Sequence, residues 1–170
     1  IKNKLKQNDS QKVVELIDKI GDNARESITN LSDIVWSINP MNDSGELVFS
    51  RMESFATSIL ASKNIALDFK FEEVFLKKEF SMEFRQNLFL IFKEAINNSV
   101  KYSETEKIEV TASLQNKELM LLVKDFGKGF DLSLIKKGNG LDNMHHRAEE
   151  LGGRLTVSSS SSQGTELKFQ

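Results

Sequence analysis

The chain has 170 residues, of which 39% are hydrophobic and 28% charged, as is typical of a soluble globular protein. This length suits one ordinary domain, or a smaller domain with an appendage. Its net charge of −2 gives no reason to expect direct contact with nucleic acid. The absence of cysteine excludes disulfides and thiolate metal sites and agrees with a reducing compartment. No apolar run approaches the roughly 18 residues of a membrane helix. Because the sequence begins at an isoleucine, we expect it to be part of a longer protein whose upstream segments would carry any membrane anchor.

The first forty residues carry a seam at alternating steps of three and four, in which only Gly21 is not clearly apolar. The seam positions are Val14, Ile17, Gly21, Ala24, Ile28, Leu31, Val35 and Ile38. This spacing predicts a long helix in a coiled coil or helical bundle, whose partner helix comes from a second copy or from upstream sequence. The alternative is a lone amphipathic helix that packs on its own domain. Asn39-Pro40 is expected to end the helix.

Downstream of Pro40, helices and strands are mixed. Asp43 and Glu46 look like a capping box that opens a helix over 45–62, and alternating apolar residues predict a strand over 65–71. The other expected elements are a helix over 81–102, strands over 107–114 and 118–124, a helix over 141–151, and strands over 154–158 and 165–169. We therefore predict an α+β fold: a two-layer sandwich whose mixed, mainly antiparallel sheet has helices on one face, preceded by the long heptad helix.

The segment KEAINNSVKYSE, residues 93–104, places polar groups inside an otherwise apolar helix. Glu94, Asn98 and Lys101 fall within about 60° of one another on a helical wheel. Leu90 and Ile91 lie on the same side one turn earlier, which indicates a cleft. A carboxylate, an amide oxygen and an ammonium along a cleft suit a hydrated Mg²⁺ and the phosphates around it. A solvated helix face would explain the stripe equally well.

Glycine motifs follow. In VKDFGKGF, residues 123–130, Asp125 ends an apolar strand and must find hydrogen-bond donors, such as the amine of adenine, while the two glycines allow close backbone approach. Gly138-Asn139-Gly140 opens a helix, and such a helix start binds phosphate. Thr165 enters the last strand and could share a hydrogen bond with Asp125. Alone, the first motif could be an ordinary Asp-Gly turn and the second a simple helix cap; their order and spacing are more specific.

That order closely resembles the catalytic, ATP-binding part of a bacterial two-component sensor histidine kinase, in the histidine kinase and gyrase ATPase superfamily. EAINNSVKYS is similar to its asparagine box, DFGKGF to its first glycine box, GNGLDNM to its second and SQGTELKF to its third. The match covers residues 65–170 and is most like the subfamily with a short nucleotide lid and an M-x-x-R after the second glycine box. The heptad helix with LSDIVWSINPMND resembles the second helix of the dimerisation and phosphoacceptor domain.

The resemblance implies three parts: the second dimerisation helix over 1–40, a connecting helix over 41–64, and the ATP-binding catalytic domain over 65–170. It implies binding of ATP and Mg²⁺ and phosphoryl transfer from ATP to a histidine, which makes the intact protein an ATP-dependent protein histidine kinase. It also implies a homodimer through the heptad helix, a response regulator receiver domain as partner, and a cytoplasmic location, with membrane attachment only through upstream segments.

The resemblance further implies residue roles. The residues expected to bind ATP are Asn98, Lys101, Tyr102, Asp125, Gly127, Gly129, Gly138, Gly140, Arg147 and Thr165. Asn98 would also bind Mg²⁺, and Asp125 would accept a hydrogen bond from the adenine amine with help from Thr165. Lys101 would contact phosphate, and Glu94 would orient or deprotonate the attacking imidazole.

The remaining implied roles concern the pocket and the lid. Gly127 and Gly129 would shape the adenine pocket, and Gly138 and Gly140 the hinge of the lid. Tyr102 would pack against the nucleotide. Arg147 would reach phosphate or pair with a glutamate.

One departure from the family concerns histidine. The chain has only His145 and His146, both in a predicted helix where they are expected to be surface residues, so the acceptor histidine is expected before Ile1 and the fragment should not phosphorylate itself. The alternatives are an ATPase, with Glu94 activating water, an anti-sigma type serine kinase, and a pseudokinase that only transmits helix movement.

Overall fold

The computed structural model describes the backbone of residues 2–116, 118–131 and 139–170. The chain divides into two compact units, the first ending at Ile38 and the second spanning Asn39–Gln170. None of the helices in the described part of the chain is both long enough and apolar enough to cross a membrane.

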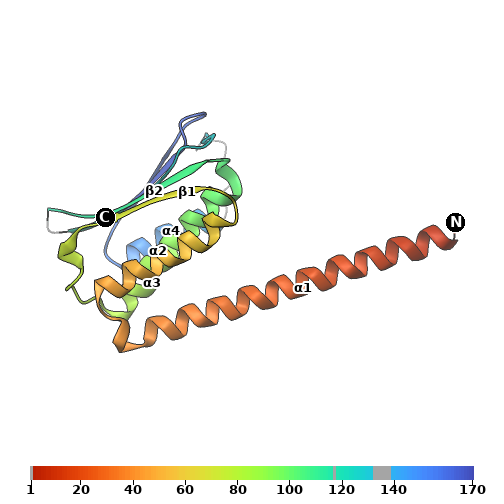
Figure 1. Ribbon diagram of the computed structural model, residues 1–170, viewed down its shortest axis with the longest axis horizontal. Coiled ribbons are helices and arrows are strands. Elements are labelled where there is room, and N and C mark those ends of the chain that lie inside the picture. Colours follow the sequence, from red (N-terminus) through yellow and green to blue (C-terminus); the bar gives the residue numbers. More distant parts are fainter. Residues whose placement is uncertain (1, 117, 132–138) are drawn as a thin grey trace. The chain divides into compact units, whose positions relative to one another are not determined.

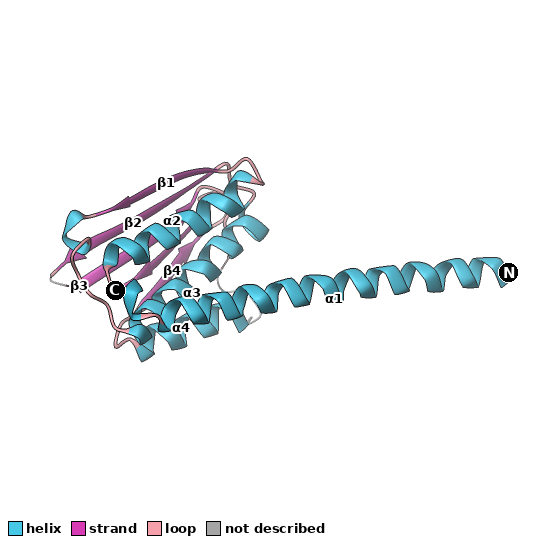
Figure 2. Cartoon of the chain, turned by 60° about the horizontal axis from the view of Figure 1, so that its bottom comes forward, coloured by secondary structure: helices cyan, strands magenta, loops and turns pink. Residues whose placement is uncertain are grey.

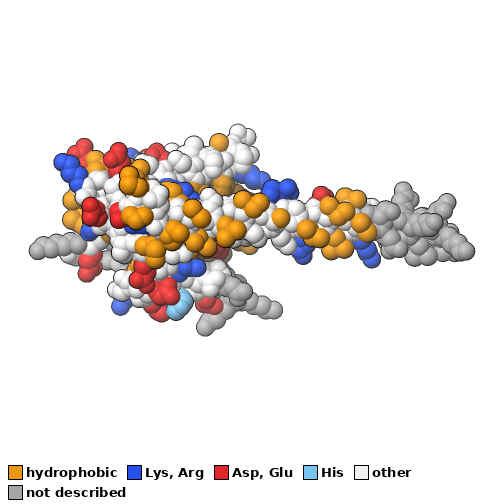
Figure 3. Space-filling model, turned by 90° about the horizontal axis from the view of Figure 1, so that it is seen from below, with side chains coloured by type: hydrophobic (Ala, Val, Ile, Leu, Met, Phe, Trp, Pro, Cys, Tyr) orange, Lys and Arg blue, Asp and Glu red, His pale blue; other side chains and the backbone are white. Residues whose placement is uncertain are grey.

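The first unit is a single helix, α1, Lys2–Ile38. It ends directly before Asn39-Pro40, as predicted. Figure 3 shows hydrophobic side chains gathered along this helix. The exposed ones are Val13, Val14, Leu16, Ile17, Ile20, Ile28, Leu31, Ile34, Val35 and Ile38. An apolar face this wide favours packing against other helices.

The second unit is a five-stranded sheet with helices on one face (Figures 1 and 2). The strands are β1 (Ala66–Phe71), β2 (Lys107–Gln115), β3 (Glu118–Asp125), β4 (Leu155–Ser159) and β5 (Thr165–Phe169). The helices are α2 (Gly45–Ala61), α3 (Met82–Asn98) and α4 (Asn139–Glu150). The strand order is β1-β2-β3-β5-β4, with β1 and β2 parallel and the other pairs antiparallel. The predicted α+β sandwich with a mixed, mainly antiparallel sheet is therefore confirmed.

The core lies between the sheet and its helices. Every second side chain is buried along β3 and along β2 as far as Ala112, as expected of a sheet with one covered face. Helix α3 packs against these strands with an apolar stripe, and its buried hydrophobic residues are Leu88, Phe89, Ile91, Phe92, Ala95 and Ile96. Phenylalanines link the layers: the ring of Phe49 in α2 stacks on that of Phe71 in β1, with centroids 5.2 Å apart.

Helix α2 lies in the segment 41–64, which we expect to connect the two domains. It belongs to the same compact unit as the sheet, and its apolar residues are buried against α3 and β1. These residues are Val48, Phe49, Met52, Ala56 and Leu60. The first unit ends at Ile38 and the second begins at Asn39, whereas the role of residues 41–64 as a connector stays a prediction.

The start of α2 differs from the predicted capping box. Its N-cap is Ser44, whose Oγ accepts a hydrogen bond from the Leu47 amide at 3.4 Å. The predicted cap, Asp43, instead forms an ion pair with the buried guanidinium of Arg85. The predicted cap was wrong because the capping-box spacing describes neighbouring residues only. It could not reveal that Asp43 pairs with Arg85, 42 residues further along the chain.

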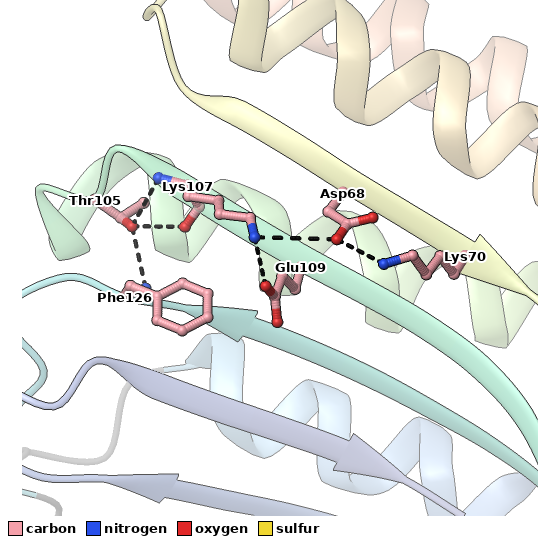
Figure 4. A network of polar contacts seen from close by, with 6 residues as sticks. All are labelled: Asp68, Lys70, Thr105, Lys107, Glu109 and Phe126. Atoms are coloured by element: carbon pink, nitrogen blue, oxygen red, sulfur yellow. Dashed lines mark hydrogen bonds and ion pairs between the residues drawn. The ribbon is translucent and has the colours of Figure 1, made fainter.

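The opposite face of the sheet carries paired charges (Figure 4). The Lys70 ammonium lies 2.8 Å from the Asp68 carboxylate and lowers the pKa of Asp68 below its usual value through this hydrogen bond. The Lys107 ammonium lies 2.5 Å from the Glu109 carboxylate, which raises the pKa of Lys107. These side chains form ion pairs with one another at an exposed surface, where such pairs contribute little to the stability of the fold.

Candidate functional site

A cavity of about 600 Å³ lies between α3, α4 and the sheet. It brings together residues that are up to 73 positions apart, from Glu94 to Leu167. Of the predicted site residues, it is lined by Glu94, Asn98, Lys101, Tyr102, Asp125, Gly129, Gly140 and Thr165. The polar helix and the glycine motifs, each weak alone, therefore meet around one space.

The polar stripe lies where the helix changes its winding. Helix α3 ends at Asn98 and continues as a π-helical turn, Ser99–Ser103, a feature that is frequent at functional sites. Asn98, Lys101 and Tyr102 all line the cavity, whereas the neighbouring Asn97 is not among the lining residues. Residues of α3 and of the π-helical turn thus face the same cavity.

Two buried hydroxyl groups hold the end of this turn. Ser103 Oγ donates a hydrogen bond to the Ser99 carbonyl at 2.6 Å and accepts one from the Thr105 amide at 3.2 Å. Thr105 Oγ1 in turn accepts a hydrogen bond from the Phe126 amide at 3.1 Å, as Figure 4 shows. The π-helical turn is thereby tied to the residue that follows Asp125.

Asp125 is the buried acid of the cavity, with an exposed fraction of 2%. Its Oδ1 accepts hydrogen bonds from the amides of Gly127 and Thr165, each at 3.1 Å. Its Oδ2 accepts a hydrogen bond from the Ser99 hydroxyl, also at 3.1 Å. Three donors thus replace the water that a buried carboxylate has lost.

Thr165 reaches Asp125 through its backbone, whereas the sequence suggested its hydroxyl. Asp125 and Thr165 are paired residues of β3 and β5, so the Thr165 amide points at the carboxylate. The Thr165 hydroxyl lies 3.1 Å from Ser159 Oγ instead. This side chain lines the cavity and is held by β4 rather than by Asp125.

The glycines of D-x-G-x-G are required by close packing. A Cβ at Gly127 would overlap the carbonyl of Ser103. Gly129 has a φ of +58°, and a Cβ there would overlap the carbonyl of Ser160. Gly129 lines the cavity. Gly127 allows the loop after β3 to pack closely against Ser103 of the π-helical turn.

The second glycine motif is only partly described. Gly138 lies outside the described residues. Gly140 lies in the first turn of α4, so close to Glu94 that a Cβ would overlap its carboxylate. The glycine thus lets the start of α4 approach the acid on α3.

Arg147 and the two histidines lie elsewhere on α4. Arg147 Nη1 donates a hydrogen bond to Asn87 Oδ1 at 2.8 Å, and Asn87 Nδ2 donates to Glu150 at 3.2 Å. Arg147 is not among the residues that line the cavity, so its contact with phosphate stays a prediction. His145 and His146 are exposed.

Sequence reasoning missed several lining residues. Ser99 and Lys128 stand beside motif residues, which was the available signal. The Lys128 ammonium lies 2.6 Å from the Glu104 carboxylate and lowers the pKa of Glu104 through this hydrogen bond. Apolar lining residues come from five helices and strands and from the loop after β3, and were not predicted together; they are Ala95, Val123, Phe130, Leu141, Met144, Val157 and Leu167.

The arrangement suits a ligand with two unlike ends. Near Asp125 the cavity offers a buried acceptor and apolar walls, which fit a flat ring that carries a hydrogen-bond donor. Near α4 and the π-helical turn it offers the oxygens of Glu94 and Asn98 and the ammonium of Lys101. These oxygens are of the hard type that Mg²⁺ takes beside phosphate oxygens.

Comparisons with known proteins agree with this geometry. The chain is similar to the sensor histidine kinase LiaS of Bacillus subtilis, with 36% identity over 85 residues, 49% of this chain and 24% of that protein. It is similar to the histidine-protein kinase/phosphatase DegS of Bacillus subtilis, with 38% identity over 87 residues, 49% of this chain and 23% of that protein. The chain thus spans about a quarter of the length of these relatives.

The fold is that of solved histidine kinases. The Acinetobacter baumannii histidine kinase AdeS aligns with a TM-score of 0.63 at 16% identity, over 86% of this chain and 79% of that one. Full-length ShkA, solved in complex with AMPPNP, aligns with a TM-score of 0.60 at 19% identity, over 73% and 29%. Residues 84–170 match the family described as histidine kinase-, DNA gyrase B-, and HSP90-like ATPase, so the chain belongs to this family.

Proposed function

We propose that the cavity binds ATP with Mg²⁺ and that the intact protein transfers the γ-phosphoryl group to a histidine in two-component signalling. The observation that carries the proposal is the buried Asp125 carboxylate in the same cavity as Glu94, Asn98 and Lys101. The family of the chain and the AMPPNP bound to ShkA support it.

The hydrogen bonds of Asp125 favour adenine over guanine. Oδ1 already accepts from two amides and Oδ2 from Ser99, so the carboxylate can only accept from a ligand. The 6-amino group of adenine donates, whereas the 6-oxo group of guanine would face the carboxylate as a second acceptor. A buried pair of acceptors is costly, and the site should therefore discriminate strongly between the two bases.

The other end of the cavity would hold the phosphates. Asn98 would supply an oxygen to Mg²⁺, and the Lys101 ammonium would bind a phosphate oxygen. Bound Mg²⁺ would neutralise charge on the phosphates. Because phosphoryl transfer depends mainly on positioning and charge neutralisation, these two residues would supply much of what the protein contributes.

Glu94 would act on the nucleophile. In the transfer, a nitrogen of the acceptor imidazole bonds to the γ-phosphorus while the bond to the bridging oxygen breaks, and ADP leaves. The imidazole then carries a positive charge, and the Glu94 carboxylate would accept the proton of its other ring nitrogen. Under this proposal the acceptor histidine belongs to the dimerisation domain outside residues 1–170, and neither His145 nor His146 is phosphorylated.

The exposed seam of α1 supports dimerisation in the intact protein. Its apolar residues follow a heptad spacing over more than three repeats, which suits a bundle formed with the helices of a second copy. The phosphohistidine would then pass its phosphoryl group to a response regulator receiver domain.

An ATPase is the second candidate, because Glu94 lines the cavity and could deprotonate water in place of imidazole. The two functions differ in where the γ-phosphate goes.

Labelled ATP distinguishes these candidates. With Mg²⁺ and γ-labelled ATP, the full-length protein should acquire label that is stable in base and lost in acid, whereas residues 1–170 alone should acquire none. Labelled free phosphate with an unlabelled full-length protein would show the ATPase instead. Acid-labile label on residues 1–170 would place the acceptor at His145 or His146 and overturn the assignment of an outside acceptor.

A further inference from the structure

Arg85 is a charged side chain in the core of the second unit. It lies near the start of α3 and is 2% exposed. A buried guanidinium is costly unless its donors and its charge are satisfied. Its contacts therefore indicate which parts of the chain it holds together.

The guanidinium contacts backbone and acidic groups from separate segments of the chain. Nη1 donates a hydrogen bond to the Phe80 carbonyl at 2.7 Å and forms an ion pair with the Asp43 carboxylate. Nη2 donates to the carbonyl of Asn39, 46 residues away in sequence, at 3.4 Å. Asn39 is the residue that directly follows α1. Arg85 thus joins α3 to the segment where the first unit ends and the second begins.

This segment, residues 39–45, which we name the joint, is folded in its own right. The Asn39 side chain accepts a hydrogen bond from the Met41 amide at 3.0 Å, and its carbonyl accepts one from the Asn42 amide at 3.0 Å. Pro40 fixes the backbone between them. The joint is therefore a short turn with its own cap rather than an open linker.

The joint is also docked on the segment before α3. The Phe80 amide donates to the Asp43 carbonyl at 2.9 Å, and the Gly45 amide donates to the Lys78 carbonyl at 2.7 Å. A Cβ at Gly45 would overlap the carbonyl of Phe75, so this position requires glycine. The joint is thus held both by these backbone contacts and by the Arg85 side chain.

Helix α3 connects the joint to the cavity. Arg85 lies thirteen residues before Asn98 on this helix, a distance of about 20 Å at the rise of an α-helix. We propose that Arg85 is a positioning residue, which fixes the joint to the helix that carries Glu94 and Asn98 so that the γ-phosphate is presented to the acceptor in one orientation. The proposal rests on the proposed function, and it needs no contact between Arg85 and the nucleotide.

Two substitutions test the contact. Arg85→Lys keeps the charge but loses the forked geometry, and Asp43→Asn removes the charge partner at a half-exposed side chain. Arg51→Lys is the matched control, because Arg51 lies in the same unit and packs over the Phe89 ring at 5.0 Å. Hydrogen exchange of the Asp43 and Gly45 amides, measured on residues 1–170, should be about tenfold faster in the first two variants and unchanged in the control.

Kinetics of the full-length protein test the positioning. Both joint variants should lower kcat of histidine phosphorylation about tenfold or more, since small misplacement slows transfer strongly, while KM for ATP stays within about twofold. A loss of ATP affinity equal to the loss of kcat, or an unchanged kcat with faster exchange, would overturn the proposal. If Arg85→Lys does not fold, Asp43→Asn decides alone. If the unsubstituted protein neither binds ATP nor phosphorylates itself, the proposed function fails. Unchanged hydrogen exchange in the Arg85→Lys and Asp43→Asn variants would separately show that Arg85 does not hold the joint.

Discussion

Replacement of Asp125 by asparagine should weaken ATP binding by about a hundredfold. Oδ1 must accept from the amides of Gly127 and Thr165, so the side-chain NH₂ of the new residue would take the place of Oδ2. There it would face the Ser99 hydroxyl and the adenine amine as a donor. Loss of a hydrogen bond to a charged group, together with this clash of donors, corresponds to about 3 kcal/mol, or about a hundredfold in affinity. Isothermal titration with ATP measures the effect.

Ser99→Ala provides the graded comparison for this prediction. It removes one of three donors to Asp125 and leaves the acceptor for adenine in place, so affinity should fall by only about threefold to tenfold. Circular dichroism should show that both variants remain folded. An affinity of the Asp125→Asn protein within about threefold of the unsubstituted one would show that Asp125 does not bind the base.

Asn98→Ala should remove the dependence of ATP binding on Mg²⁺. The amide oxygen is the only proposed protein ligand of the ion, and Mg²⁺ is otherwise held by phosphates and water. We expect ATP affinity to be unchanged in EDTA but at least about tenfold lower in Mg²⁺ than that of the unsubstituted protein. Phosphoryl transfer in the full-length protein should fall by at least about a hundredfold.

The neighbouring asparagine is the matched control. Asn97→Ala makes the same chemical change one residue earlier, at a side chain that does not line the cavity. It should leave binding in Mg²⁺ within about twofold of the original value. Equal losses in the two variants would mean that the effect comes from the helix and not from a magnesium ligand.

Much of the fold followed from patterns that one element carries by itself. The heptad seam predicted α1, and Pro40 predicted where this helix ends. The alternation of Ile108, Val110 and Ala112 predicted a strand with one buried face. The pairing at the β1 edge of the sheet could not be predicted from the sequence. Strand β1 pairs in parallel with β2, which follows it only after the whole of α3, and the pattern of one strand does not specify its neighbouring strand.

The candidate site was predictable where motifs placed residues at fixed offsets. Asn98, Asp125 and Gly129 line one cavity, whereas their contacts with a nucleotide stay predictions. The position of Ser99 beside a motif residue indicated that it lies near the site, but its hydrogen bond to Asp125 did not follow from the sequence. The ion pair of Asp43 with Arg85 did not follow either, because in both cases folding brings the partners together. An arginine in an amphipathic helix is normally an exposed residue, so its burial became apparent only with the tertiary structure.

We propose that the cavity beside Asp125 and Asn98 binds adenine nucleotide with Mg²⁺. Calorimetric titration of residues 1–170 with ATP, with ATP and Mg²⁺, and with GTP and Mg²⁺ measures this binding. We expect saturable one-to-one binding of ATP that Mg²⁺ strengthens, and binding of GTP that is weaker by about a hundredfold. Equal binding of ATP and GTP, or no binding of ATP in the presence of Mg²⁺, would contradict it.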